Sequence, residues 1–142
     1  MRRVNHLAVL VAAVAAFVLS SFYYRLFAQQ IVDLHPTDPE VVAAMMKPAP
    51  WKVLAEIGRT VVVAYVLARF VNRLGITDWK GALGLGFWVW LGFPVAMLVG
   101  ASLWDNKPWM LTAIHAGDWL MKMLLMAVVL STWRGIWASN SQ

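Results

Sequence analysis

Four long stretches of apolar residues, separated by short polar segments, form the main pattern of this chain. They cover about 4–24, 52–71, 81–104 and 110–133, and each is close to the ~20 residues that a helix needs to cross a bilayer core. The second stretch is the weakest because charged residues interrupt it, whereas the third contains no charge. A helix satisfies its own backbone hydrogen bonds, as the lipid interior demands. The pattern predicts an all-α integral membrane protein, with residues 1–142 forming a single membrane domain of four transmembrane helices.

The only long connection, residues 25–51, predicts one additional short helix near 39–46. Pro39 suits the first turn of a helix, and Glu40 interacts favourably with the positive end of the helix dipole. Pro48 then prevents the helix from continuing. Two interpretations of this helix remain open: an interfacial helix that lies on the outer leaflet, or a lid over a cavity between the transmembrane helices.

Composition supports a membrane protein. Hydrophobic types make up 61% of the 142 residues and charged types 13%, which is about half the charged share of a soluble domain. A soluble chain of this size could not hide so much apolar surface, because a domain of about 150 residues buries only about 70% of what its unfolded chain exposes. The chain has no cysteine, which excludes disulfides and thiolate metal sites.

The net charge of +5 reflects basic residues near the predicted helix ends, so it indicates membrane topology rather than nucleic-acid binding. With four spans, the N-terminus, the 72–80 loop and the C-terminus share one side. That side carries Arg2, Arg3, Arg69, Arg73, Lys80 and Arg134, and the other side carries Arg25, Lys47, Lys52 and Lys107. The positive-inside rule then places both termini in the cytoplasm. The expected partners are membrane lipids and other membrane protein subunits or further copies of the chain.

Small residues recur every four positions on two of the predicted helices. The two ridges are Ala8, Ala12, Ala16 and Ser20 on the first helix, and Gly92, Ala96 and Gly100 on the third. Such spacing lets helix backbones approach closely in lipid, so we expect both ridges to lie at helix–helix interfaces. Pro94 falls inside the third helix and predicts a kink there.

The fourth predicted helix carries three titratable residues on one face. His115, Asp118 and Lys122 are spaced i, i+3 and i+7 in an otherwise apolar segment. A charge inside the membrane costs roughly 2.5–3.5 kcal/mol on insertion scales, so such residues usually face a partner or a cavity. Glu56 and Arg59 lie at comparable depth on the second helix. We expect Asp118 to pair with Arg59, or failing that with Lys122, and Glu56 to reach His115 or Lys122.

Two interpretations of these five residues remain open. They form either ion pairs that join two helices, or a polar cavity for a proton, an ion or a small ligand. No second histidine stands at ligand spacing from His115, so we expect no metal and no cofactor. Motifs for phosphate binding, nucleophilic catalysis and metalloproteases are absent from the sequence, and we do not expect an enzyme. The expected function is that of a structural or accessory subunit of a larger membrane assembly. The alternative is a small transporter or ligand-binding membrane protein that uses the charged residues.

Four short motifs are spread over most of the chain. They are Asn5-x-Leu7-Ala8-Val9-Leu10-Val11-Ala12-Ala13, Trp79-x-Gly81-Ala82-Leu83, Trp90-Leu91-Gly92-Phe93 and Trp133-Arg134. Together they resemble a bacterial four-helix membrane family catalogued as domain of unknown function 1761. The resemblance implies the fold, the topology and a location in the bacterial inner membrane, and none of its motifs is catalytic. The family commonly shows Ile-Asn-Ala-Gly-Tyr where this chain has Ile114-His115-Ala116-Gly117-Asp118, so the departure falls on the polar face itself.

Overall fold

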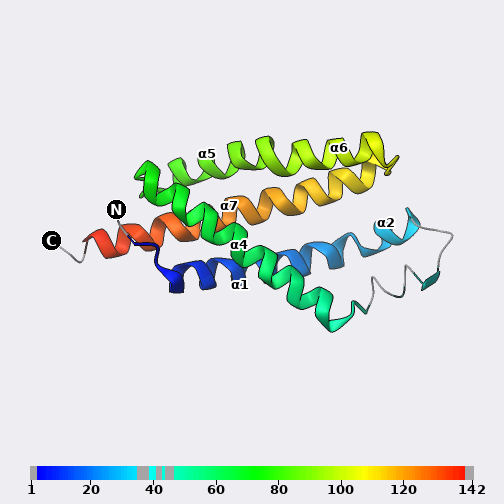
Figure 1. The fold of residues 1–142 in the computed structure, drawn as a ribbon, viewed down its shortest axis with the longest axis horizontal. Coiled ribbons are helices and arrows are strands. Elements are labelled where there is room, and N and C mark those ends of the chain that lie inside the picture. The colour runs from blue at the N-terminus through cyan, green and yellow to red at the C-terminus, as the bar shows by residue number, and fades with distance from the viewer. Residues whose placement is uncertain (1–2, 35–38, 41–42, 44–46, 140–142) are drawn as a thin grey trace.

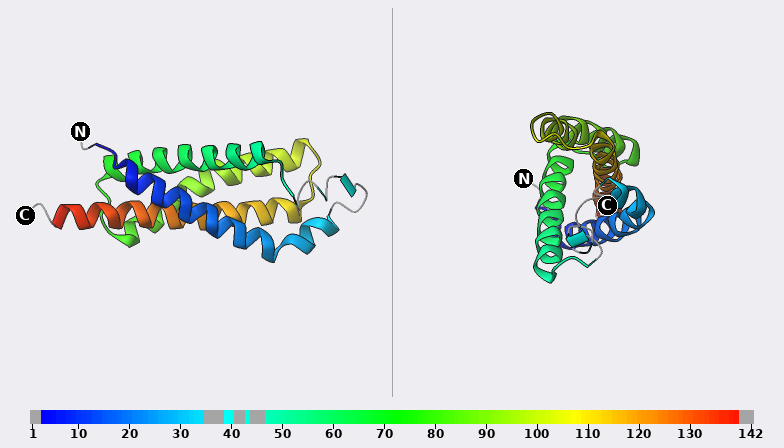
Figure 2. Two further views of the ribbon diagram at one scale, coloured as in Figure 1. Left: turned by 90° about the horizontal axis from the view of Figure 1, so that it is seen from below. Right: turned by 90° about the vertical axis from the view of Figure 1, so that its right-hand side faces the viewer.

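The computed structural model describes residues 3–34, 39–40, 43 and 47–139, and all the regular structure in these ranges is helical. Its elements are α1 (His6–Leu26), α2 (Ala28–Asp33), α4 (Pro50–Leu74), α5 (Trp79–Trp90), the π-helical turn η1 (Leu91–Val95), α6 (Ala96–Trp104) and α7 (Trp109–Ser139). Figure 1 shows α5, η1 and α6 as one continuous rod beside α7, with α4 crossing α1 obliquely. The result is an elongated bundle built from long helical rods (Figure 2).

Three helices are long and apolar enough to cross a membrane: His6–Leu26, Trp79–Trp104 and Trp109–Arg134. The remaining long helix, α4, has 25 residues, but it carries more charged residues than the other three. The short helix expected at 39–46 falls largely outside the described residues. The first connection also contains α2, a short helix that the sequence pattern did not suggest.

Local capping fixes where several helices begin and end. The Asn5 side chain accepts hydrogen bonds from the first backbone amides of α1, and Asp78 does the same for α5 through the amide of Gly81 at 2.9 Å. Gly75 ends α4 in the left-handed conformation, with φ of 71°. Arg134 of α7 donates to the carbonyl of Val71 at 2.8 Å and so ties the end of α4 to α7. The start of α1, the end of α7 and the α4–α5 turn lie at the same end of the bundle (Figure 1).

Pro94 lies in the π-helical turn η1, where it is buried. Proline has no amide hydrogen to donate and its ring crowds the preceding turn, so a regular α-helix cannot pass through it undisturbed. A wider π turn accommodates such a residue without breaking the helix. The disturbance expected at Pro94 is therefore local, and the helix continues directly into α6.

The small-residue ridge of α1 lies at the centre of the bundle. Ala8, Ala12 and Ala16 are buried where α1 packs against α7 and α4, and Ser20 continues this face. Because the side chains are short, the three helix backbones come close together and gain dispersion contacts.

The ridge expected on the third helix does not pack against another helix of the described bundle. This corrects the prediction for Gly92, Ala96 and Gly100. Gly92 and Ala96 are exposed, and a Cβ built on Gly92 or Gly100 would meet nothing within 4 Å. The rod packs on α7 through another face: a Cβ on Gly86 would come within 3.1 Å of the Met123 carbonyl oxygen. Gly86 and Trp90 lie one turn apart on that face, which turns Gly92 away from α7.

Candidate functional site

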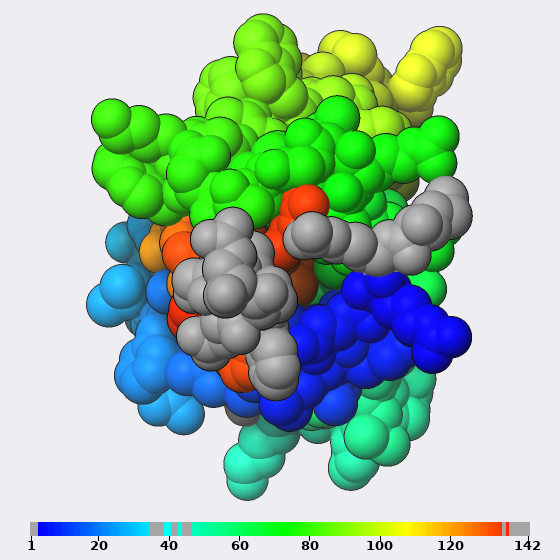
Figure 3. Space-filling model, turned by 90° about the vertical axis from the view of Figure 1, so that its left-hand side faces the viewer, coloured from blue at the N-terminus to red at the C-terminus, as the bar shows by residue number. Residues whose placement is uncertain are grey.

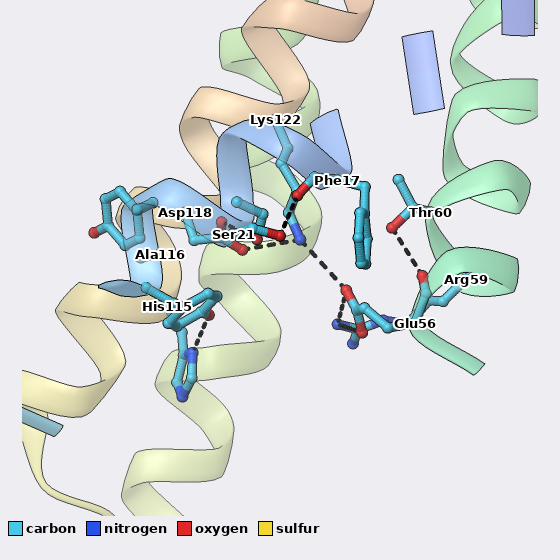
Figure 4. Close-up of polar contacts among 12 residues, drawn as sticks. Phe17, Ser21, Glu56, Arg59, Thr60, His115, Ala116, Asp118 and Lys122 are labelled. Atoms are coloured by element: carbon cyan, nitrogen blue, oxygen red, sulfur yellow. Dashed lines mark hydrogen bonds and ion pairs between the residues drawn. The ribbon is translucent and has the colours of Figure 1, made fainter. Parts of the chain in front are cut away.

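The five charged or titratable residues expected to form a polar cluster all line one cleft of about 810 Å³. Its walls come from α1, α4, α6 and α7, and it lies at the end of the bundle near the start of α4 and the α6–α7 connection. Figure 4 shows the Lys122 ammonium group between the carboxylates of Asp118 and Glu56. The other cleft residues include Ser20, Tyr24, Arg25, Lys52, Lys107 and Trp119.

An ion pair between Asp118 and Lys122 forms the buried part of the site. The Lys122 Nζ lies 2.8 Å from Asp118 Oδ2, and both side chains are 2% exposed. The Ser20 hydroxyl donates to the other carboxylate oxygen, Oδ1, at 2.6 Å. Asp118 therefore has a positive partner and a hydrogen-bond donor, which a charge removed from water requires.

The expected Asp118–Arg59 pair is corrected by this geometry. Asp118 and Lys122 are one turn apart on α7, so their side chains meet without any movement of the helices. Arg59 instead contacts Glu56 on its own helix, with Nη2 2.7 Å from Oε2, and its side chain is 57% exposed. Each carboxylate thus takes its closest basic partner from the same helix.

Glu56 also links α4 to α7. Its Oε1 lies 3.6 Å from Lys122 Nζ, while the Thr60 hydroxyl donates to the Glu56 carbonyl oxygen at 2.9 Å. Glu56 therefore lies between a buried ammonium group and an exposed guanidinium group, as Figure 4 shows.

Trp119 contributes a surface that the sequence analysis did not identify. Its ring lies 4.0 Å from Lys122 Nζ and 5.0 Å from the Arg59 guanidinium carbon, measured to the ring centroid. Both cations gain a cation–π interaction, which strengthens when the groups are shielded from water. Trp119 directly follows Asp118, but its sequence position alone does not show which cation its ring meets.

His115 lies in the cleft but outside the ion pairs. Its Nδ1 is 2.6 Å from the Tyr24 hydroxyl of α1, and the neighbouring Tyr23 hydroxyl donates to the Ile114 carbonyl oxygen at 2.8 Å. A Cβ on Gly117 would overlap the Tyr23 hydroxyl, so the missing side chain lets α1 approach α7. The sequence analysis missed these two tyrosines, although Ser20, Tyr23 and Tyr24 fall on one helical face.

The cleft is predominantly positive. It is lined by Arg25, Lys52, Arg59, Lys107 and Lys122, against the carboxylates of Glu56 and Asp118. In the part of the chain that the structure describes, no group of three histidines, cysteines or acids could hold a metal ion. The arrangement is suited to ion pairing and hydrogen bonding with an anion.

Comparison with known protein families identifies the chain. The family model described as "Protein of unknown function (DUF1761)" matches residues 7–131, so the chain belongs to this family. This confirms the resemblance inferred from the sequence motifs. No curated protein and no solved structure matches the chain significantly.

Proposed function

We propose that this DUF1761 protein is a bacterial inner-membrane protein with four transmembrane helices and cytoplasmic termini, which binds a small anionic solute between α1, α4 and α7. The observation that carries the proposal is the buried Asp118–Lys122 pair beside a positively charged cleft. Ion pairs that serve only to join helices need no cleft of about 810 Å³ beside them. Binding sites of small molecules typically occupy pockets of about 300–1,000 Å³ with a few convergent polar groups.

The length of α4 and the positions of its charged residues support it as the fourth transmembrane helix. At 1.5 Å per residue its 25 residues extend about 37 Å, enough to cross a hydrocarbon core of about 30 Å. Lys52, Glu56 and Arg59 line the cleft, and Arg69 and Arg73 stand near the other end. Polar residues in membrane helices usually face such a cavity rather than lipid. Four spans would also explain why the two chain ends lie at one end of the bundle (Figure 1).

The distribution of basic residues supports the orientation. Among the described residues, the end of the bundle with both chain ends carries Arg3, Arg69, Arg73, Lys80 and Arg134. The opposite end also has basic residues, but more acidic residues, such as Asp33 and Asp105, accompany them, whereas the end with both chain ends has Asp78. The positive-inside rule favours the cytoplasm for the end with the larger excess of lysine and arginine.

The charge of the cleft indicates an anionic ligand. Its five basic residues exceed its two acidic residues by three, and such an excess in a low-dielectric cleft attracts anions. The forked Arg59 guanidinium is more than half exposed, and this group binds carboxylates through two parallel hydrogen bonds. An entering carboxylate would compete with Glu56 for Arg59, and Glu56 would then be free to pair more closely with Lys122.

Arg59→Gln is expected to weaken binding of small dicarboxylates. Loss of a charged hydrogen bond of about 1.5–3 kcal/mol corresponds to a decrease in affinity of roughly 10- to 150-fold. Thermal unfolding of the detergent-purified protein would be followed while succinate is titrated against sodium chloride of equal ionic strength. The wild type should gain stability with succinate beyond that with chloride, and Arg59→Gln should not. Lys80→Gln, which removes a positive charge outside both this cleft and the arginine-lined pocket at the other end of α4, is the matched control. Equal responses of all three proteins would contradict the proposal.

A second candidate function, that of an accessory subunit, is favoured by the exposed ridge on the third rod. Gly92 and Ala96 are exposed, and a Cβ built on Gly92 or Gly100 would meet no atom of another helix within 4 Å. Ridges of this kind serve as contact surfaces between membrane helices. Purification in mild detergent should then yield a larger complex by native mass spectrometry, and Gly100→Leu should dissociate it. A wild-type protein that is monomeric and free of other chains would contradict this second function.

A further inference from the structure

A second pocket lies at the opposite end of α4 from the cleft. It has a volume of about 570 Å³, and its polar and aromatic lining residues are Arg3, His6, Tyr65, Arg69, Asn72 and Arg73. None of its lining residues is acidic. Figure 3 shows this end of the molecule, with the start of α1 in blue and the end of α4 in green.

The three arginines of this pocket are available to a ligand. Within the described ranges, the ion pairs involve Arg59, Lys107 and Lys122, and none involves Arg3, Arg69 or Arg73. Arg134, at the same end, donates instead to backbone carbonyls at the end of α4. Three guanidinium groups that lack an acidic partner in one concave site favour the binding of an anion.

The geometry of the pocket favours phosphate. His6 stacks on Tyr65 with ring centroids 6.2 Å apart and an interplanar angle of 11°, which joins the start of α1 to α4. Arg69 and Arg73 follow Tyr65 at intervals of one helical turn and so share its face. Guanidinium groups bind phosphate oxygens through pairs of parallel hydrogen bonds.

Apolar residues extend from the pocket toward the middle of the bundle. Leu10 follows His6 by one turn on α1, and Val62 and Val66 precede Arg69 on α4 by two turns and one turn. All three are exposed, at 52%, 62% and 45% respectively. A ligand that fills both regions therefore has an anionic head and hydrocarbon chains.

We propose that this pocket binds the phosphate headgroup of an anionic phospholipid, whose acyl chains lie along the exposed faces of α1 and α4. Basic pockets between membrane helices are known to hold such headgroups. The positive-inside rule alone requires only that basic residues be present on one side; it does not gather three of them in one pocket beside a stacked His6–Tyr65 pair. The proposal does not depend on the function of the cleft or on the orientation in the membrane.

Native mass spectrometry of the full-length protein in detergent would test this, with dioleoylphosphatidylglycerol and dioleoylphosphatidylcholine as competing probes. The wild type should prefer phosphatidylglycerol. Each arginine is expected to contribute about fivefold to the affinity for phosphatidylglycerol. Arg69→Gln with Arg73→Gln should therefore lower this affinity about 25-fold, and Arg73→Gln alone about fivefold. The matched control is Lys47→Gln with Lys80→Gln, which also removes two positive charges but leaves the pocket intact. This control should bind phosphatidylglycerol like the wild type.

The source of the phosphate is tested with glycerol 3-phosphate, which has the same phosphate group but no acyl chains. It should compete poorly with phosphatidylglycerol, because it cannot contact Leu10, Val62 and Val66. Three results would overturn the proposal. They are equal binding of the two lipids by the wild type, equal loss of binding in the arginine and lysine double variants, and displacement of the lipid by glycerol 3-phosphate at comparable concentration.

Discussion

Asp118→Leu is expected to lower the free energy of unfolding by about 3–5 kcal/mol, because it leaves the buried Lys122 ammonium group without its closest partner. Glu56 is 3.6 Å from Lys122 Nζ and compensates only in part, and the Ser20 hydroxyl loses its acceptor. Unfolding of the purified protein in mixed detergent micelles, followed by tryptophan fluorescence, would measure the loss.

Two further variants distinguish the contribution of the ion pair to stability from that of side-chain packing. Adding Lys122→Met to Asp118→Leu removes both charges, and should recover most of the stability because apolar residues of similar size replace a buried pair at little cost. Glu56→Gln is the matched control at a side chain 36% exposed, where the loss of an ion pair costs about 1 kcal/mol or less. If Asp118→Leu were no more damaging than Glu56→Gln, the Asp118–Lys122 pair would be in contact with water and would not be a buried element of the bundle.

The convergence of the charged residues could be predicted from the sequence, whereas their pairing could not. Helical periodicity places His115, Asp118 and Lys122 on one face, and the cost of exposing charge to lipid directs that face inward. The choice between Arg59 and Lys122 as the partner of Asp118 depends on how far α4 lies from α7. That distance is set by packing along the whole length of the helices. Local geometry then favours the partner one turn away on α7.

The aromatic residues of the site were missed for a related reason. Trp119, Tyr23 and Tyr24 are compatible with contact to lipid, to another helix or to a membrane interface, and their sequence positions do not distinguish these environments. Their roles follow from the approach of α1 to α7, which Gly117 permits by leaving room for the Tyr23 hydroxyl.

The two small-residue ridges show what a periodic pattern alone can predict. Both have the spacing that allows close helix approach, but a membrane helix exposes apolar surface to lipid as readily as to another helix. A row of small residues therefore does not determine whether that helix face packs against another helix or contacts lipid. On α1 the ridge includes Ser20, whose hydroxyl donates to Asp118. On the third rod the buried polar residue is Ser102, which hydrogen-bonds to Thr112 of α7 and does not belong to the Gly92–Ala96–Gly100 ridge.

Ala12→Leu and Ala16→Leu are each expected to lower the free energy of unfolding by about 1–3 kcal/mol, the usual cost of overpacking a well-packed site. Both alanines are fully buried, so a larger side chain must push α1 away from α4 and α7.

Ala96→Leu makes the same chemical change at an exposed position and should leave the unfolding temperature of the purified protein unchanged. Thermal unfolding in detergent compares the three variants directly. The change in helix propensity and the gain in hydrophobicity are the same in all three variants. A difference in their unfolding temperatures can therefore come only from packing. An Ala96→Leu variant as unstable as Ala12→Leu would place the third rod's ridge in a tight interface and contradict the arrangement of the helices.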